Sequence, residues 1–549
     1  MKNNLSFHIP ENKRETGLIV SNHHLFWDGD PDSIVFDEAE VRDYLMDLNQ
    51  PIWIIKTQNE IGFSQQGNFK SEPKGPFEIA AWTNPISIKQ FGDSSFCEDY
   101  NVKAAYYAGG MANAISSEEM VIALGKSGFI GSFGAAGLSL ARLESAIQKI
   151  QLALSLGPYI FNFIHNPLEP SLEQRTIDLY LQYGIRVIEA AAFINLSPSI
   201  VTYRAVGLSL GSTGEINIKN RIIAKVSRKE VASKFLQPAP EKILQELITN
   251  GHITEQQAVL ARQVPIADDI TVEADSGGHT DNRPLVSLLP SVIALRNQLQ
   301  NQYKFRSPVR IGAGGGISTP ESALAAYMMG AAYVVTGSVN QACTESGACE
   351  HTRRLLAQAD IADVIMTPSA DMFEMGVRVQ VLKKGTLYPM RAQKLYDLYS
   401  NYNSIEEIPT EERGKIEKKI FQLPLEVVWQ NTEEFFNQRD PQQIIKAENN
   451  PKRKMALIFR WYLGLSSRWS RDAVKGREMD YQIWCGPSIG AFNEWTKNTY
   501  LEEYQNRHVT DVTQQILNGC AYCYRVQALK LQGLNLPSHL EAYIPEPLN

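Results

Sequence analysis

Cysteine is scarce in this sequence, with six residues among 549. The one close pair, in "CAYC" at residues 520–523, has no second pair and no neighbouring histidines, which a zinc site would need. His23 and His24, with Asp28 and Asp30, offer metal-ligating atoms, but adjacent residues of a strand point to opposite faces and cannot easily share one ion. We therefore expect reduced thiols and no metal centre.

An excess of positive charge is also missing. Lys and Arg number 53 against 60 Asp and Glu, which gives a formal charge of −7 and a pI near 5.8. A protein with this balance has no overall attraction for nucleic acid. The start, "MKNNLSFHIPENKRE", lacks the apolar core of a signal peptide, and the longest apolar stretches are broken by glycine and fall short of a membrane span. We expect a cytoplasmic protein that does not bind DNA.

The length and the 44% apolar content predict two or three structural units with a large core. Residues 1–75 carry short strand-like runs such as "GLIVSN" and "PIWIIK" and end near a linker, "KSEPKGP", which predicts a small β-rich unit. Residues 379–549 are rich in helix formers and charge, which predicts a helical extension.

The central region, residues 76–378, alternates apolar strand candidates with helical patterns. Strands buried on both faces have continuous apolar runs, and eight of them alternating with helices are typical of a (β/α)8 TIM barrel. The eight candidates are "KAAYY", "FIGSF", "YIFNFI", "RVIEAA", "RIIAKV", "ITVEAD", "VRIGAG" and "AYVVTG". Residues 229–265 are too many for a barrel connection and carry helical patterns. We interpret them as a helical insertion that either caps the substrate entrance or braces the extension.

Two glycine-containing loops follow the last two strand candidates. A TIM barrel has its active site at the C-terminal ends of the strands, and phosphate often binds where the loops after strands seven and eight meet. Gly314 ends the seventh candidate and is followed by Gly315 and Gly316, and Gly337 ends the eighth and is followed by Ser338. Glycines let backbone N–H groups approach an anion, so these two loops predict a phosphate site.

Residues at the ends of earlier strands suggest which phosphate ligand binds there. Gly109, Gly110 and Met111 follow the first strand, Asn162 lies in the third, and Lys225 ends the fifth. Flavin mononucleotide (FMN) fits these features, with small residues under its ring system and an amide or lysine near N1 to stabilise the charge of the reduced flavin. A sugar phosphate or another metabolite would fit the phosphate loops equally well, and Lys225 alone could be a satisfied polar residue.

Several long motifs resemble a known family. "EADSGGHT", "GAGGGISTPESALAAYMMGAAYVVTGSVNQAC" and "AGGMANAIS" resemble the nitronate monooxygenase superfamily of flavoproteins, which includes flavin-dependent enoyl-acyl carrier protein reductases. "EADSGGHTDNRPL", "DMFEMGVRVQVLKKGTLYPMRAQKLYDLY", "ALIFRWYLGLSSRWS" and "DYQIWCGPSIGAFNEW" look like the PfaD family, the enoyl reductases of polyunsaturated fatty acid synthases and trans-acyltransferase polyketide synthases. The absence of a fused acyltransferase resembles the stand-alone form.

The resemblance implies an activity and partners. It implies reduction of the α,β-double bond of 2-enoyl thioesters carried by an acyl carrier protein, with hydride from NADPH passed through FMN. It does not separate the polyketide pathway from the fatty acid pathway, and the oligomeric state, a homodimer included, stays open. An oxygen-using nitronate monooxygenase would share the barrel and flavin but has no evident use for the extension. A non-catalytic scaffold would have no use for the phosphate loops.

The loop after the sixth strand carries the candidate catalytic residue. Gly277 and Gly278 let this loop pass close to the flavin, and His279 then projects over the ring where a substrate would stack. In the superfamily this histidine is the candidate for proton transfer, and its near-neutral pKa suits donation to the α-carbon. We place Asp275 beside the cofactor and expect it, like Asp281 and Asn282, mainly to orient the loop.

The segment from Lys452 to Arg477 is basic within an acidic protein. It holds eight cations and one acid, Asp472, interleaved with Trp461, Tyr462 and Trp469. The cations are Lys452, Arg453, Lys454, Arg460, Arg468, Arg471, Lys475 and Arg477. Because carrier proteins are commonly acidic and deliver a phosphopantetheine arm, part of this segment could dock the carrier or its phosphate. A solvated helix face whose aromatics pack on the barrel is the alternative.

Overall fold

The computed structural model describes residues 25–58, 60–70, 77–155, 157–167 and 169–548. His23 and His24 lie outside these residues. Within them, no three His, Cys, Asp or Glu side chains are arranged to hold a metal ion. Nor does any helix in the described ranges combine the length and apolar character needed to cross a membrane.

Eight parallel strands close into a barrel, which confirms the predicted TIM fold. Each strand lies within one of the eight candidates, or extends it by one residue. The barrel order is β12-β13-β15-β16-β6-β7-β8-β9. The strands are β6 (Tyr106–Ala108), β7 (Ile130–Phe133), β8 (Ile160–Ile164), β9 (Val187–Ala191), β12 (Arg221–Val226), β13 (Asp269–Glu273), β15 (Arg310–Gly314) and β16 (Val334–Thr336).

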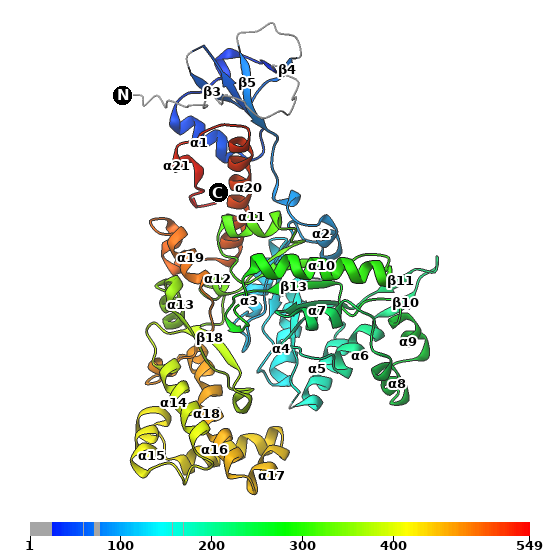
Figure 1. Ribbon diagram of the computed structural model, residues 1–549, viewed down its shortest axis with the longest axis vertical. Coiled ribbons are helices and arrows are strands. Elements are labelled where there is room, and N and C mark those ends of the chain that lie inside the picture. The colour runs from blue at the N-terminus through cyan, green and yellow to red at the C-terminus, as the bar shows by residue number, and fades with distance from the viewer. Residues whose placement is uncertain (1–24, 59, 71–76, 156, 168, 549) are drawn as a thin grey trace.

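Helices cover the outside of the barrel and follow the strands in the expected alternation (Figure 1). Several begin with a Ser or Thr side chain that accepts a hydrogen bond from the first turn, as Thr319 does for α11. The barrel helices are α2 (Ser94–Tyr100), α3 (Glu118–Lys126), α4 (Leu140–Leu154), α5 (Pro170–Gln182), α6 (Pro198–Val206), α7 (Lys229–Phe235), α10 (Leu285–Tyr303), α11 (Pro320–Met328), α12 (Ser338–Gln341) and α13 (Glu350–Ala357).

The insertion after β12 is helical, as expected, but it is not a cap. Its helices α8 (Glu241–Thr249) and α9 (Glu255–Ala261) pack against α6, and α9 also packs against β10 (Leu208–Leu210), which pairs with β11 (Ile216–Ile218). Leu244 of α8 is fully buried there. The apolar faces of these helices therefore pack against the outside of the barrel. Residues 229–265 do not line the cavity described below.

The N-terminal unit is a five-stranded antiparallel sheet in the order β3-β2-β5-β1-β4, with one helix, α1 (Glu38–Met46). Its last strand lies beyond the boundary expected at residue 75. Helix α20 (Val509–Leu531) packs against both α1 and β5 and also against α11, so it ties this sheet to the barrel (Figure 1). The strands are β1 (Phe26–Asp28), β2 (Ile52–Lys56), β3 (Ile61–Ser64), β4 (Asn68–Lys70) and β5 (Glu78–Thr83).

The C-terminal extension is helical but begins with a small sheet. Strands β17 (Val364–Pro368) and β18 (Arg378–Leu382) are antiparallel, and β18 also pairs with β14 (Gly278–His279) from the loop after β13. The boundary expected at residue 379 therefore falls inside β18. The helices are α14 (Tyr388–Asn401), α15 (Thr410–Ile416), α16 (Leu425–Arg439), α17 (Gln442–Glu448), α18 (Pro451–Asp472), α19 (Ser488–Trp495), α20 (Val509–Leu531) and α21 (Ser538–Glu541).

Short helical turns complete the described elements. A π-helical segment, η5 (Glu417–Phe421), follows α15. The single 3-10 turns are η1 (Pro31–Ser33), η2 (Ile88–Gln90), η3 (Ile361–Asp363), η4 (Phe373–Met375), η6 (Glu478–Asp480), η7 (Tyr500–Glu502) and η8 (Tyr504–Asn506). The extension lies along one side of the barrel, with α14–α18 at one end of the molecule and α20 beside the N-terminal unit (Figure 1).

Candidate active site

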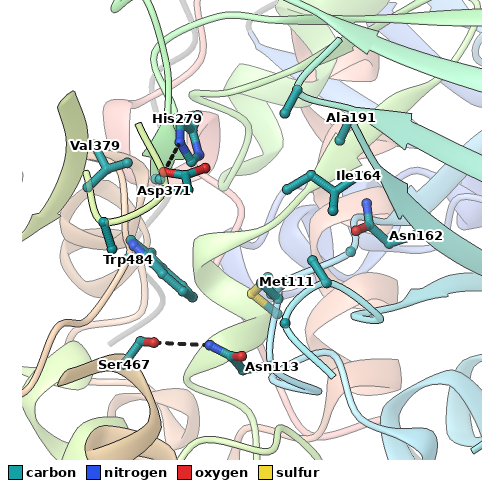
Figure 2. Close-up of a pocket in the computed structure, with 18 of the residues that line it drawn as sticks. Met111, Asn113, Asn162, Ile164, Ala191, His279, Asp371, Val379, Ser467 and Trp484 are labelled. Atoms are coloured by element: carbon teal, nitrogen blue, oxygen red, sulfur yellow. Dashed lines mark hydrogen bonds and ion pairs between the residues drawn. The ribbon is translucent and has the colours of Figure 1, made fainter. Parts of the chain in front are cut away.

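A cavity of about 700 Å³ lies at the C-terminal ends of the barrel strands. Its floor comes from the strand ends and the loops that follow them. The rest comes from the extension, including residues of α16 and α18 and Trp484, which Figure 2 labels. This volume is typical of a pocket for a cofactor-sized ligand. The predicted residues that line it are Gly109, Gly110, Met111, Asn162, Lys225, Gly277, Gly278, His279, Gly314, Gly315, Gly316, Gly337 and Ser338.

The two phosphate loops meet in this cavity. Gly315 and Gly316 have φ values of +79° and +78°, which favour glycine, and a Cβ at Gly315 would lie 2.7 Å from the Ala274 backbone. At Gly316 and Gly337, by contrast, an added Cβ would meet nothing within 4 Å. Ser338 Oγ accepts a hydrogen bond from the Gly486 N–H at 2.9 Å, which leaves its own proton free to donate. This open backbone fits an anion.

The loop after β6 has its N–H groups committed inside the protein. The Gly109 N–H donates to Thr336 O at 2.9 Å, the Gly110 N–H to Glu189 Oε2 at 2.8 Å, and the Met111 N–H to Ser116 Oγ at 3.0 Å. A ligand here therefore meets small side chains and carbonyls rather than free amides. That surface suits the face of a flat ring.

Lys225 lies between two carboxylates at the cavity floor. Its Nζ is 3.5 Å from Glu189 Oε1 and 3.3 Å from Glu273 Oε1. Burial alone would lower the pKa of Lys225, but the two carboxylates together raise it above its usual value. Lys225 is therefore a fixed positive charge. Asn162 Nδ2 donates to Glu189 O at 3.4 Å, and its side chain borders the same cavity (Figure 2).

His279 projects into the cavity from a braced loop. The pairing of β14 with β18 places His279 opposite Val379, and a Cβ at Gly277 would lie 2.6 Å from Cys485 Cα. His279 Nε2 is 3.1 Å from Asp371 Oδ1 (Figure 2). No hydrogen bond to His279 Nδ1 occurs within the described residues. Nδ1 is thus the ring atom that can hold a proton toward a ligand.

Asp371 is itself held in place. Ser369 Oγ donates to Asp371 Oδ1, and the Met372 N–H donates to the same atom at 3.1 Å. Burial would raise the pKa of Asp371, but the charge and hydrogen bond of His279, together with the hydrogen bond from Ser369, lower it well below its usual range. Burial would likewise lower the pKa of His279, yet the charge and hydrogen bond of Asp371 raise it above 6.5. The pair therefore favours imidazolium beside carboxylate.

Asp275 is the predicted cofactor residue that the structure does not bring to the cavity. Asp275 Oδ1 accepts hydrogen bonds from Gln380 Nε2 at 2.7 Å and from Asn282 Nδ2 at 2.8 Å. Asp281 pairs with Arg228 at 2.7 Å. These contacts agree with the expected role in orienting the loop. Asp275 faces β18 because the extension supplies its partners.

His165 lines the cavity but has a partner. Its Nδ1 is 2.9 Å from Glu173 Oε2, and its ring stacks on Phe193 with the centroids 4.8 Å apart. This arrangement is that of a satisfied histidine at a strand end. His279 is therefore the better candidate for proton transfer.

Most cations of the basic segment are used inside the protein, so it is not a solvated basic face. Lys452 Nζ donates to the Tyr402 O at 2.5 Å, which ties α18 to the end of α14. Arg477 Nη1 donates to Ile420 O at 2.8 Å. Only Arg460 and Arg468 of the eight line the cavity. They do so beside Trp461, whereas Tyr462 and Trp469 are buried.

Reasoning from the sequence missed the residues that the extension supplies. Asp371 lies 92 positions from His279, in "SADMFEM", and no spacing rule connects them. Trp484 and Arg439 also line the cavity, and nothing in the sequence pattern points to them. One signal in the sequence could have pointed to Asp371. The apolar run that forms β18 predicts a buried strand in an otherwise helical region, and such a strand needs a partner strand, which would bring the residues just before it, Asp371 among them, close to another part of the fold.

Three family models match the chain. A nitronate monooxygenase model matches residues 98–397, and a model described as the fatty acid synthase subunit PfaD N-terminal domain matches residues 27–82. The third, the inserted helical domain of [acyl-carrier-protein] S-malonyltransferase, matches residues 402–481, within the extension. Together these models cover the sheet, the barrel and the helices that complete the cavity.

Individual relatives agree with these matches. A polyunsaturated fatty acid synthase polypeptide of Thraustochytrium sp. is 47% identical over 92% of this chain, and polyketide biosynthesis protein PksE of Bacillus subtilis is 43% identical over 83%. The chain spans only 34% and 58% of those proteins. The crystal structure of the enoyl reductase domain of MlnA from Bacillus amyloliquefaciens has 39% identity and a TM-score of 0.77, covering 81% of this chain and 100% of that one. The chain belongs to the PfaD family of the nitronate monooxygenase superfamily.

Proposed function

We propose that the chain is a flavin-dependent enoyl reductase that acts on carrier-bound 2-enoyl thioesters with NADPH as reductant. The observation that carries this proposal is the His279–Asp371 pair, which borders the same cavity as the open phosphate loops. A reductase of this kind needs a flavin site and a proton donor side by side. The name of the MlnA enoyl reductase domain supports the same reaction class.

The residues fit FMN as the cofactor. Gly316, Gly337 and Ser338 would hold its phosphate, since their backbone or hydroxyl faces open space, and the loop at Gly109 would lie against its ring. Lys225 would offset negative charge near the ring. When bound, FMN would take two electrons from NADPH and pass hydride to the β-carbon of the enoyl thioester.

The chain's own residues would complete the reaction. Addition of hydride at the β-carbon leaves negative charge on the thioester enolate, and the α-carbon must then gain a proton. His279 Nδ1 can supply that proton, because Asp371 occupies Nε2 and keeps the ring as imidazolium to higher pH. A neutral imidazole remains, still hydrogen-bonded to Asp371.

The cavity also offers an apolar wall for an acyl chain. Leu457, Trp461 and Leu465 on α18 line it, as do Ile164 and Met111 from the barrel side. An extension that completes an apolar pocket gives a long substrate somewhere to lie, for which a small nitronate has no need. The names of the relatives place them in fatty acid and polyketide synthesis, which supports a carrier-bound acyl substrate from one of these pathways.

The test is anaerobic turnover. With oxygen excluded, the purified protein is expected to oxidise NADPH only when a 2-enoyl thioester on a carrier protein is present, and to yield the saturated chain. Mass spectrometry of the released acyl group measures the gain of two hydrogens. Turnover that needs oxygen and a nitronate would instead assign the oxidase activity, and absence of flavin would favour a scaffold.

Replacing Gly337 by leucine is expected to weaken FMN binding about tenfold or more, because the side chain would occupy the space of the phosphate and displace charge-assisted hydrogen bonds. The wild-type protein is expected to be yellow and to release FMN on denaturation. Gly414→Leu on the exposed helix α15 is the matched control. Equal FMN content in both variants, measured by absorbance, would move the phosphate elsewhere. Gly315 suits this test less, since a side chain there meets the Ala274 backbone.

A further inference from the structure

The charged side chains that line the cavity are paired with one exception. Lys225 pairs with Glu273, His279 with Asp371, and the other pairs join the lining to helices of the extension or the barrel. These are Arg439 with Glu169, Arg460 with Glu374, and His165 with Glu173. Among the described residues, Arg468 is the lining cation for which no carboxylate lies within ion-pair distance.

Arg468 projects from the last turns of α18 and is only partly exposed. It makes one hydrogen bond within the described ranges, from Nη2 to Gly137 O at 3.3 Å. A guanidinium has five N–H donors, so most of its capacity is unused. A half-buried charge without a partner is unfavourable, and a ligand anion would relieve it.

The neighbours of Arg468 leave its charge without a counterion at ion-pair distance. Burial lowers the pKa of Arg468, and the charges of Arg439 and Arg471 lower it further; the charge of Asp472 acts in the opposite direction but does not outweigh them. The carboxylates nearby are already engaged: Glu169 receives Arg439 at 2.6 and 2.8 Å, and Asp472 receives Arg471 at 2.6 and 2.9 Å. The carboxylates near Arg468 are therefore already bound to other arginines, and a ligand anion could still pair with Arg468.

We propose that Arg468 binds a phosphate group of a ligand that enters the cavity, separate from the loops at Gly316 and Gly337. This inference rests on the proposed function, which brings two phosphate-bearing ligands to the cavity: the phosphopantetheine arm of the acyl substrate and the reductant NADPH. The planar guanidinium matches the geometry of phosphate oxygens and stays charged. Both ligands share this chemistry.

The place of α18 fits the phosphate of a bound arm. Ser467, the residue before Arg468, shows where this part of α18 lies: its Oγ accepts a hydrogen bond from Asn113 Nδ2 at 3.0 Å. In Figure 2 the Ser467–Asn113 contact and the His279–Asp371 pair border the cavity on different sides, with Trp484 between them in this view. A ligand that reaches His279 with its thioester could extend toward Arg468 with its other end.

The test compares probes that differ in one phosphate. Calorimetry with the flavin-loaded protein would measure binding of phosphopantetheine, of pantetheine and of NADP+ to the wild type and to Arg468→Gln. We expect phosphopantetheine to bind the wild type roughly tenfold to a hundredfold more tightly than pantetheine, the size of a lost charge-assisted hydrogen bond. In Arg468→Gln this difference is expected to vanish while pantetheine binding is unchanged.

A matched control is Lys475→Gln, which removes an exposed charge just after α18, outside the cavity. If Arg468→Gln weakens NADP+ instead of phosphopantetheine, the phosphate site stands and the reductant is its source. If Arg468→Gln binds both ligands as tightly as Lys475→Gln does, the proposed phosphate site at Arg468 is wrong. These binding ratios do not depend on turnover, so a protein that fails to reduce enoyl thioesters would refute the proposed function without deciding this site.

Discussion

Replacing His279 by alanine is expected to slow reduction of the enoyl thioester by about 10²–10⁴-fold, the usual cost of losing a positioned general acid. Flavin content is expected to stay the same, because His279 contributes nothing to the open backbone at Gly316 and Gly337. The rate at which NADPH reduces the flavin is expected to be unchanged as well, because that step does not require a proton from the imidazole. Stopped-flow absorbance of the flavin separates the two half-reactions.

The control for this experiment is His252→Ala, which removes an exposed histidine in the insertion, outside the cavity. If His279→Ala reoxidises with the enoyl substrate as fast as this control, while keeping its flavin, His279 is not the donor. Water would then be the proton source, because His165 is already held by Glu173. Loss of both half-reactions together would indicate a disturbed flavin site rather than a missing acid.

The barrel could be predicted because its signal is local. Each strand is a short apolar run, such as "RIIAKV" in β12. Because these strands are buried on both faces, apolar and polar residues do not alternate along them as they do in a strand with one face in solvent. The phosphate loops could be predicted for a related reason. Once the strands are numbered, the fold itself assigns the glycines after the seventh and eighth strands to one end of the barrel.

The other half of the cavity could not be predicted, because it depends on how the extension packs. Asp371 reaches His279 only because β18 pairs with β14, a contact between segments far apart in the chain. The same packing turns Asp275 toward Gln380 and away from the cavity. Spacing within one segment carries no information about such contacts, so it places Asp275 beside the cofactor and does not connect Asp371 with His279.

The basic segment illustrates the same limit. Its charge density suggests an exposed docking face, but side chains such as Lys452 and Arg477 donate to backbone carbonyls of neighbouring helices. Composition reports how many cations a segment has and not which of them are already paired. Charge reversal at Arg453, which lies near Glu374 and Gln443, would disturb α18 before it tested any partner.

Replacing Asp371 by asparagine is expected to lower the pKa of His279 and to move the loss of activity to lower pH. The sign follows from the required form: the imidazolium is the acid, so activity falls as pH rises through the His279 pKa. In the wild type Asp371 raises that pKa, and the active form persists to higher pH. Above neutral pH, each unit of pKa lost reduces the imidazolium fraction about tenfold. We therefore expect enoyl reduction to decrease at alkaline pH, where the lost imidazolium fraction has its full effect.

The decrease is expected to shrink at low pH, where the variant histidine is protonated without help from a carboxylate. This dependence separates an electrostatic role from simple damage to the loop, which would lower activity by the same factor at every pH. Asp281→Asn is the matched control, because Asp281 lies in the same loop as His279 but pairs with Arg228 outside the cavity. The pH profile of kcat/KM for the enoyl thioester, measured for the wild type and both variants, decides the question. A profile for Asp371→Asn that is scaled down without a shift would mean that Asp371 only holds the ring in place and leaves its pKa unchanged.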